Sequence, residues 1–305
     1  ILARSVLRGE ETAYSVFLPD QKALLFYVVI AWAEDYTGAV IDYGSWPDQH
    51  RHEYSLADAN PRNQTILPKA GFEGALYAAL DALTKDYLGR EWEREDGAVL
   101  KIEKALIDAN WGQSTDIIYT FCRQNVHAGV LLPSHGRYVG ASSKPMTEYR
   151  KQPGDRLGLN WMIPNVAGKR AIRHVIYDTN YWKSFIHARL AVPVGDKGSL
   201  TLYGRIPGAH QLFAEHLTAE YRVKTQGRGR TVDEWKLKPQ SHDNHFLDCV
   251  AGCAVCGSML GASLPETLPA KLDRKPMIRL SDKRLGGIPP NGRLKLSELR
   301  RQKNG

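Results

Sequence analysis

The spacing of apolar and polar positions changes several times along the chain, and each change predicts a new element. Runs rich in β-branched and aromatic residues predict strands at 12–20, 23–33 and 39–46. The short polar segment 34–38 between the second and third runs predicts a turn. Because short connections usually join neighbouring strands, we expect an antiparallel meander of three strands.

Further along, helical and strand-like spacing alternate. Apolar positions at helical spacing predict a helix over 71–89 that ends at Gly89. Residues 134–170 are rich in Gly, Pro, Ser and basic residues, which predicts a long loop. Other segments predict helices at 115–125, 179–190 and 243–260, a helix running into a strand at 209–225, and strands at 99–110, 128–136, 198–204 and 231–239. A meander followed by such units predicts an α/β fold, with a mixed sheet flanked by helices.

The composition is that of a soluble globular protein with a sizeable core. The chain has 305 residues, of which 43% are hydrophobic and 24% are charged. No run approaches the roughly 18–20 apolar residues of a membrane span, so we expect no membrane segment. Because the first residue is Ile1, we expect a fragment of a longer protein. We divide it into a linker remnant at 1–11, a folded domain at 12–265 and a basic, flexible tail at 266–305.

The positive charge is concentrated at the C-terminal end. Residues 271–305 hold eleven basic and three acidic residues, and this excess equals the net charge of +8 of the whole chain. The segment is poor in aromatic residues and contains GGIPPNG, so we expect it to be mobile. Such a tail either keeps the protein soluble or binds nucleic acid or a partner.

The four cysteines do not form a disulfide framework at this length and favour a reducing, cytoplasmic setting. A structural zinc site is one interpretation of the thiols and imidazoles around the late helix, namely His242, His245, Cys249, Cys253 and Cys256. However, consecutive ligands on one helix cannot all converge on an ion, and paired C-x2-C units are missing. Core thiols are therefore the favoured interpretation.

Two carboxylates stand where a fold would place functional groups. Asp108 lies at the predicted C-terminal end of a strand, where sites form in α/β sheets, although a turn or capping role is the alternative. Asp248 lies inside the apolar late helix, beside the small residues Ala251 and Gly252, which leave room for a ligand. A buried carboxylate needs a cation, a donor or water, although an Asp near a helix N-terminus can also be stabilised by the helix dipole.

Five segments carry a recognisable pattern, in this order along the chain: GAVIDYGSWPDQ, IDANWGQSTDIIYTFCR, YDTNYWKSFIHARL, HLTAEYRVKTQGRGRTVDEWKLKP and DNHFLDCVAGCAVCGSML. Together they resemble the nuclease half of the phage terminase large subunit of the gpA type, over about residues 12–262. The resemblance implies an RNase H-like fold in which acids of the first strand, a central strand and a late helix converge on divalent metal ions. It places Asp108 and Asp248 at the second and third of these positions, as catalytic residues and metal ligands. Asp243 is a weaker candidate metal ligand.

The first-strand position departs from the family pattern. Family members typically read like F-I-D-x-Q there, whereas this chain reads FLPDQ, with Pro19 where the acid belongs and Asp20 one residue later. A shift of one residue turns a strand side chain to the opposite face. Proline, however, is confined to strand edges, ends or bulges, and a bulge would shift the face by one residue. We therefore expect Asp20 to serve as the third catalytic carboxylate and metal ligand.

The resemblance implies a metal-dependent endonuclease that cuts double-stranded, concatemeric DNA during viral packaging, with two Mg²⁺ or Mn²⁺ ions as cofactors. No G-x-x-x-x-G-K-[ST] occurs, so we expect no ATPase in this chain. The terminase small subunit and the portal are implied partners, and the bacterial host cytoplasm, at the procapsid, is the implied place of action. We expect the DNA backbone to contact Arg137, Lys144, Arg150, Lys151, Arg228 and Arg230.

Two other functions remain open. The FLPDQ sequence motivates a DNA- or portal-binding module of the packaging machine whose nuclease site has weakened. Another RNase H-like enzyme, such as a transposase or resolvase, would have to share all five terminase-like segments by chance.

Overall fold

The computed structural model of the protein describes residues 24–94, 96–110, 112, 114–166, 172–204, 208–241 and 243–264, together with the backbone of 11–17. The predicted tail at 266–305 and, apart from residue 11, the predicted linker remnant at 1–11 lie outside the described residues. Among the described helices, none is both long enough and apolar enough to cross a membrane.

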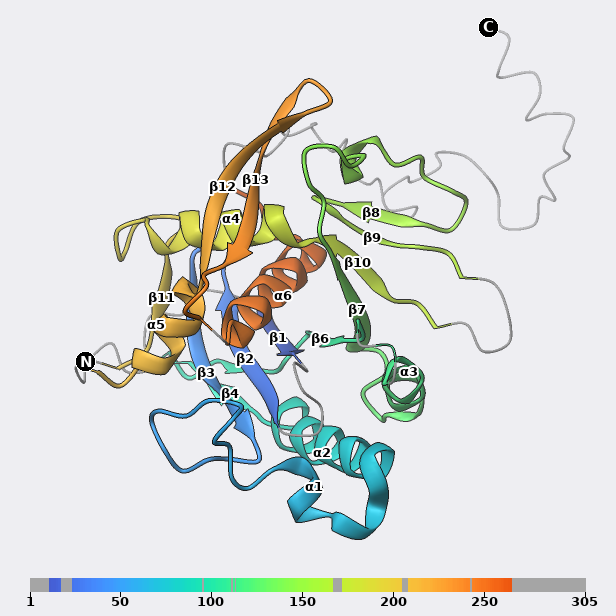
Figure 1. Ribbon diagram of the computed structural model, residues 1–305, viewed down its shortest axis with the longest axis vertical. Helices are drawn as coiled ribbons and strands as arrows, with labels where there is room; N and C mark the ends of the chain where they lie inside the picture. Colours follow the sequence, from blue (N-terminus) through green and yellow to red (C-terminus); the bar gives the residue numbers. More distant parts are fainter. Residues whose placement is uncertain are drawn as a thin grey trace, which may run out of the picture. The chain divides into compact units, whose positions relative to one another are not determined.

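Nine strands of the described part form one mixed sheet (Figure 1). In chain order they are β1 (Glu11–Phe17), β2 (Leu25–Trp32), β3 (Gly38–Trp46), β6 (Lys104–Asp108), β7 (Leu131–Arg137), β8 (Arg156–Gly158), β9 (Trp161–Ile163), β10 (Val175–Asp178) and β11 (Leu200–Leu202). Across the sheet they follow the order β11, β3, β2, β1, β6, β7, β10, β9, β8. Two smaller pairs lie outside this sheet: β4 (Trp92–Glu93) with β5 (Val99–Leu100), and the hairpin of β12 (Glu220–Gly227) and β13 (Arg230–Leu237).

The strand directions bring several chain segments to one edge of the sheet. The predicted meander is confirmed, because β1 pairs with β2 and β2 with β3, both antiparallel. From β1 the sheet continues through β6, β7 and β10, each parallel to the one before. Parallel strands end at the same edge, so the C-terminal ends of these four strands lie together.

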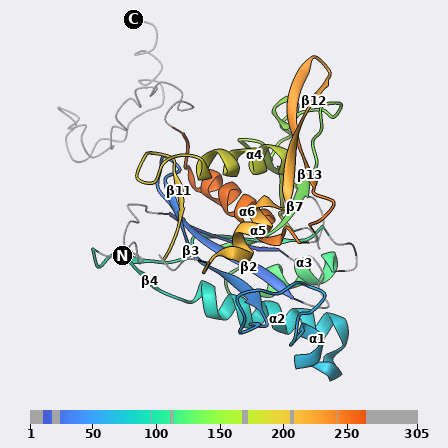
Figure 2. The same cartoon turned by 60° about the vertical axis from the view of Figure 1, so that its left-hand side comes forward.

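Alternation along β2 explains why helices cover both faces of the sheet. Phe26 and Val28 belong to one core cluster and Leu25 and Val29 to another, because successive strand side chains point to opposite faces. The first cluster includes residues of α4 (Thr179–Leu190), α5 (Gln211–Thr218) and α6 (His245–Leu260), and the second includes residues of α2 (Gly71–Leu88) and α3 (Thr115–Gln124). Figure 2 shows α4, α5 and α6 on one side of the sheet and α2 on the other.

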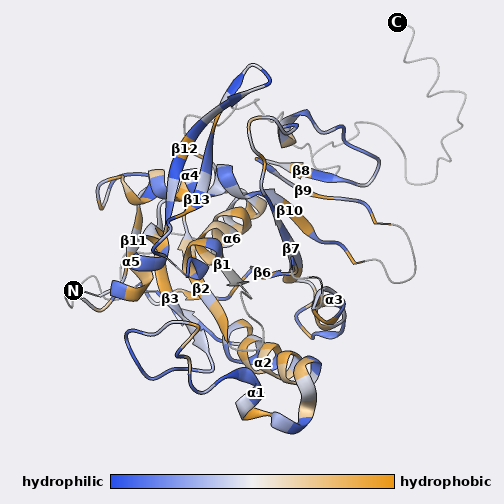
Figure 3. Ribbon diagram, viewed as in Figure 1, coloured by the Kyte–Doolittle hydropathy of each residue, from blue (hydrophilic) through white to orange (hydrophobic). Residues whose placement is uncertain are grey.

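The helix α6 is built as a core element. Figure 3 shows it in largely hydrophobic colours, in contrast to the hydrophilic hairpin β12–β13. The thiols of Cys249 and Cys253 donate to the carbonyl oxygens of Phe26 and Val28, at 3.5 and 3.3 Å, so they are core thiols as predicted. The helix ends at Leu260 and is capped by Gly261, whose φ of 116° lies in the region that favours glycine.

The predicted helices at 71–89, 115–125, 179–190 and 243–260 are confirmed as α2, α3, α4 and α6. The predicted loop over 134–170 is wrong in part, because it contains the end of β7, a 3-10 turn at Met146–Glu148 and the antiparallel strands β8 and β9. The exposed β8 lacks the apolar alternation by which a strand is recognised. The predicted strand 99–110 divides into β5 and β6, and the loop before α2 carries the short helix α1 (Asn63–Ile66).

Candidate active site

Charged side chains gather where the parallel strands β6, β7 and β10 end. Asp108 is the last residue of β6, Arg137 of β7 and Asp178 of β10. The register places Asp108 opposite Ser134, and Asp178 opposite Arg137, so these residues share the C-terminal edge of the sheet. This is the edge at which ligand sites form in α/β sheets.

Asp108 and Asp248 approach each other where β6 packs against α6. Leu106 belongs to the core on the α6 side of the sheet, so Asp108, two residues further on, points to the same face. Asp108 is 7% exposed, and burial together with the nearby carboxylate of Asp248 raises its pKa to about 7. Hydrogen bonds from the backbone N–H groups of Asn110 and Ala109 act in the opposite direction on this pKa. The structure thus brings together two of the carboxylates predicted as catalytic.

Tyr177 of β10 lies beside the same pair. Burial, and then the carboxylates of Asp108 and Asp248, raise the pKa of Tyr177 well above its ordinary value. Its neighbour across the β7 ladder is Gly136, where a Cβ would come within 3.3 Å of the tyrosine hydroxyl oxygen. The tyrosine therefore adds a neutral hydroxyl to the site and no charge.

Asp248 is compensated by a cation from another helix. The Nζ atom of Lys183, on α4, lies 2.9 Å from Oδ1 of Asp248 and 2.5 Å from Oε1 of Glu220, the first residue of β12. The side-chain amide of Asn244, one turn before Asp248, donates a hydrogen bond to the same Glu220 oxygen. Burial raises the pKa of Asp248, and the ammonium of Lys183 opposes this rise. Although burial acts to lower the pKa of Lys183, the carboxylates of Asp248 and Glu220 raise it overall.

The paired carboxylates have the donor chemistry of a divalent-metal site. Within the described ranges, no group of three His, Cys, Asp or Glu side chains could hold a metal ion. Among the described residues, no ion pair reaches Asp108, so a cation beside it would stabilise its buried carboxylate. Mg²⁺ and Mn²⁺ prefer oxygen ligands of this kind. Asp108 and Asp248 therefore fit as two ligands of a larger set.

Asp20, the predicted third carboxylate, lies outside the described residues. The strand that leads towards it is described. Val16 of β1 pairs with Ile107 of β6, so β1 ends level with Asp108. The part of Asp20 in the site stays a prediction.

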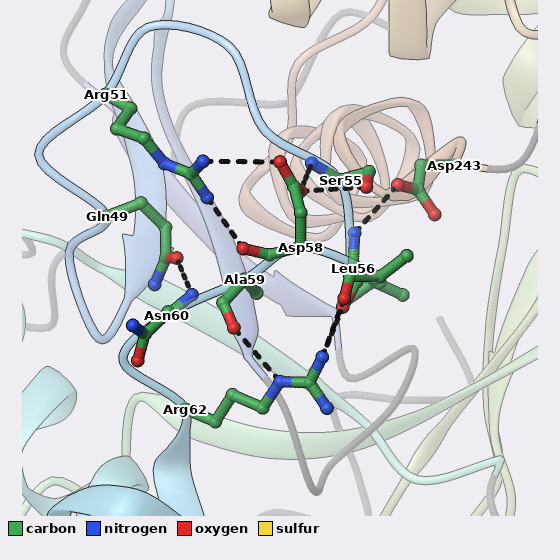
Figure 4. Close-up of polar contacts among 10 residues, drawn as sticks. Gln49, Arg51, Ser55, Leu56, Asp58, Ala59, Asn60, Arg62 and Asp243 are labelled. Atoms are coloured by element: carbon green, nitrogen blue, oxygen red, sulfur yellow. Dashed lines mark hydrogen bonds and ion pairs between the residues drawn. The ribbon is translucent and has the colours of Figure 1, made fainter.

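Asp243, the weaker predicted metal ligand, is held by other partners. Its Oδ2 accepts a hydrogen bond from the backbone N–H of Leu56 at 3.2 Å, as Figure 4 shows. Its Oδ1 lies 3.1 Å from Nε2 of His245. Although burial acts to raise the pKa of Asp243, the hydrogen bonds from His245 and Leu56 lower it overall. Both oxygens thus fasten the loop before α1 to the start of α6.

The basic residues predicted to contact DNA fall into two groups. Five of them have exposed side chains, four in or after β7 and one at the hairpin turn: Arg137, Lys144, Arg150, Lys151 and Arg228. Arg230 differs, because its Nη2 donates to the carbonyl oxygens of Gly140 and Ser143 at 2.7 and 2.5 Å. Arg230 therefore joins the hairpin β12–β13 to the segment that follows β7.

Lys183 and Glu220 belong to the site, although the sequence reasoning did not single them out. A usable signal exists for Lys183, which stands between Trp182 and Phe185 on a helix whose neighbouring side chains are buried. A cation on such a face implies a buried partner. Glu220 carries no comparable signal, because it begins a largely polar and exposed hairpin.

Comparison with protein families gives one match that covers most of the chain. The family model described as "Terminase large subunit gpA, endonuclease domain" matches residues 21–267. Searches of curated proteins and of solved structures give no match.

Proposed function

The chain belongs to the family of gpA terminase endonuclease domains, and on this premise we propose that it cuts double-stranded, concatemeric DNA in a metal-dependent reaction during viral packaging. The observation that carries this proposal is the meeting of Asp108 and Asp248 at the C-terminal edge of the parallel strands. The two buried carboxylates are only partly compensated by the ammonium of Lys183, so together they are suited to bind a divalent cation.

We further propose that the fold is RNase H-like. The central strands follow the order β3, β2, β1, β6, β7, with antiparallel pairing from β3 to β1 and parallel pairing from β1 to β7. The helix α6 crosses β1 and β2 on one face and supplies Asp248. This arrangement supports the assignment, because it places acids of a central strand and a late helix at one edge.

In the proposed site, Asp108, Asp248 and Asp20 would hold two Mg²⁺ or Mn²⁺ ions. Such ions would supply an activated water and stabilise the leaving oxygen in phosphodiester hydrolysis. The chain's own residues bind and orient the substrate. Arg137 is exposed at the same edge as Asp108 and is suited to neutralise a backbone phosphate. Tyr177 keeps its proton and can donate a hydrogen bond within the site.

The packaging role brings further partners into the proposal. Family membership supports action beside the terminase small subunit and the portal, in the host cytoplasm at the procapsid. The excess of basic residues at 271–305 suits an additional contact with DNA.

A cleavage assay tests the proposal. Supercoiled plasmid incubated with the protein and Mn²⁺ or Mg²⁺ should be nicked and linearised, and EDTA should abolish cleavage. Asp108→Asn and Asp248→Asn should each slow cleavage about a hundredfold or more, because each removes a ligand of the catalytic cations. Asp196→Asn, at an exposed position before β11, is the matched control and should cleave like the wild type. DNA binding without metal-dependent cleavage would favour a binding module instead.

A further inference from the structure

Three charged side chains from three different elements meet in the core beside Asp108. The ammonium of Lys183 lies between Oδ1 of Asp248 and Oε1 of Glu220, at 2.9 and 2.5 Å. The side chains are 9%, 13% and 5% exposed, respectively. Among the described residues, no hydrogen bond or ion pair reaches Oδ2 of Asp248. One oxygen of this carboxylate is thus paired with Lys183, and the other has no partner among the residues that the structure describes.

The arrangement poses an electrostatic problem for the proposed metal site. An ammonium at 2.9 Å from Asp248 competes with any divalent cation for that carboxylate. Two cations at such short range repel each other strongly, because screening by water is weak in a buried site. The carboxylate of Glu220 offers the ammonium a second, closer partner and brings the Lys183–Glu220 pair to zero net charge. The amide of Asn244 holds Glu220 in this position.

We propose that Glu220 is a positioning residue that balances the Lys183 ammonium, so that Asp248 stays available to a divalent cation. This inference rests on the proposed metal-dependent nuclease function and adds two residues to it. Glu220 raises the metal affinity of the site without touching the metal. Lys183 lowers this affinity and keeps Asp248 compensated while no metal is bound.

The effect of Glu220 and Lys183 on metal affinity can be measured with Mn²⁺ alone, by calorimetric titration or from the electron paramagnetic resonance signal of free Mn²⁺. Within the described part of the chain, Glu220→Gln leaves the ammonium paired with the carboxylate of Asp248 alone, so it should weaken Mn²⁺ binding about tenfold or more. Adding Lys183→Met to Glu220→Gln removes the unbalanced ammonium and should bring the affinity back to within about threefold of the wild type. A salt bridge that only holds α4, β12 and α6 together predicts no such rescue.

Two controls separate the possible failures. Glu234→Gln replaces another buried glutamate of the same hairpin, which accepts a hydrogen bond from the backbone N–H of Ala141, and should leave Mn²⁺ affinity unchanged. Asp248→Asn removes the ligand itself and should abolish tight binding. Unfolding curves check that each variant folds. If Glu220→Gln does not fold, Glu220→Asp withdraws the carboxylate by one methylene and should weaken binding in the same direction.

The outcomes distinguish this inference from the proposed function. Mn²⁺ binding that depends on Asp248 but is equally tight in the wild type and the Glu220 variant would overturn the role of Glu220 and leave the nuclease proposal standing. A double variant that binds as weakly as Glu220→Gln would overturn the competition by Lys183. A wild-type protein that shows no saturable Mn²⁺ binding would overturn the metal site, and the inference with it.

Discussion

Replacing Asp108 by Asn should stabilise the metal-free protein, and more at pH 8 than at pH 5. Burial and the neighbouring Asp248 raise the pKa of Asp108 from 3.8 to about 7. The folded protein therefore keeps this proton at pH values where the unfolded chain has released it. The stability linked to this group is fully present below pH 3.8 and is lost as the pH rises to about 7.

The size of the effect follows from the two pKa values. A rise from 3.8 to about 7 lowers the free energy of unfolding by about 2 kcal/mol at pH 5 and by about 4 kcal/mol at pH 8. Asparagine cannot ionise, so Asp108→Asn removes this penalty. The stabilisation by the variant should thus be larger at pH 8 by about 2 to 3 kcal/mol.

Urea unfolding of both proteins in EDTA, at pH 5 and pH 8, measures this difference. Burial lowers the pKa values of His135 and His216 to about 4, which destabilises both proteins alike at low pH and cancels in the comparison. Mg²⁺ should reduce the advantage of the variant, because a bound cation favours the ionised form of Asp108. A stability difference that stays constant to within about 0.5 kcal/mol between the two pH values would refute the burial of Asp108 beside Asp248.

Further outcomes are expected for the parts of the chain around this site. Asp20→Asn should slow cleavage as much as loss of the β6 carboxylate, whereas a rise in activity with Pro19→Asp would show that Asp20 does not serve as the third acid. Removal of 271–305 should weaken DNA binding and flatten its salt dependence, because this segment carries the whole positive excess; unchanged affinity and slope would leave a solubilising role. Arg228→Ala should weaken DNA binding with little effect on stability, whereas Arg230→Ala should destabilise the protein by about 1–3 kcal/mol, because two carbonyl oxygens lose their donor. Equal melting temperatures of these two variants would contradict the assignment of a DNA-binding role to Arg228 and a structural role to Arg230. The protein should not hydrolyse ATP, because the sequence contains no P-loop motif. Measurable ATP hydrolysis would contradict this expectation.

The central sheet could be predicted from the sequence because its strands have distinctive apolar runs. The run that became β2 is β-branched and aromatic, and it lies between helices on both faces. The edge of the sheet was less predictable. β8 is exposed along its length, and β10 has only four residues, Val175–Asp178, so neither shows enough periodicity to be distinguished from a loop. Their strand character depends on pairing with neighbours that are remote in sequence or irregular in pattern.

The sequence predicts a site residue only where that residue contrasts with its own sequence neighbours. A carboxylate inside the apolar α6 and another at the end of β6 stand out against their surroundings, and their meeting followed from the family resemblance. Lys183 and Glu220 are 37 positions apart in the sequence. The apolar neighbours of Lys183 indicate a buried partner but do not identify it, and Glu220 resembles an ordinary surface charge in its own segment. Their pairing becomes evident only when α4, β12 and α6 are packed together.

Asp248 and Asp108 are both buried at this edge, but their carboxylates are stabilised in different ways. Asp248 sits within a helix that must pack against the sheet for the core to form, and an uncompensated charge there would cost several kcal/mol. Lys183 supplies the compensating charge from α4, which packs into the same core, so α6 can take its place without a metal ion. Asp108 lies at the end of a strand without such a partner among the described residues, and its raised pKa means that it stays largely protonated below neutral pH. A divalent cation at this edge would therefore displace a proton from Asp108 and compete with an ammonium at Asp248, so its affinity should depend on pH through the first acid and on Glu220 through the second.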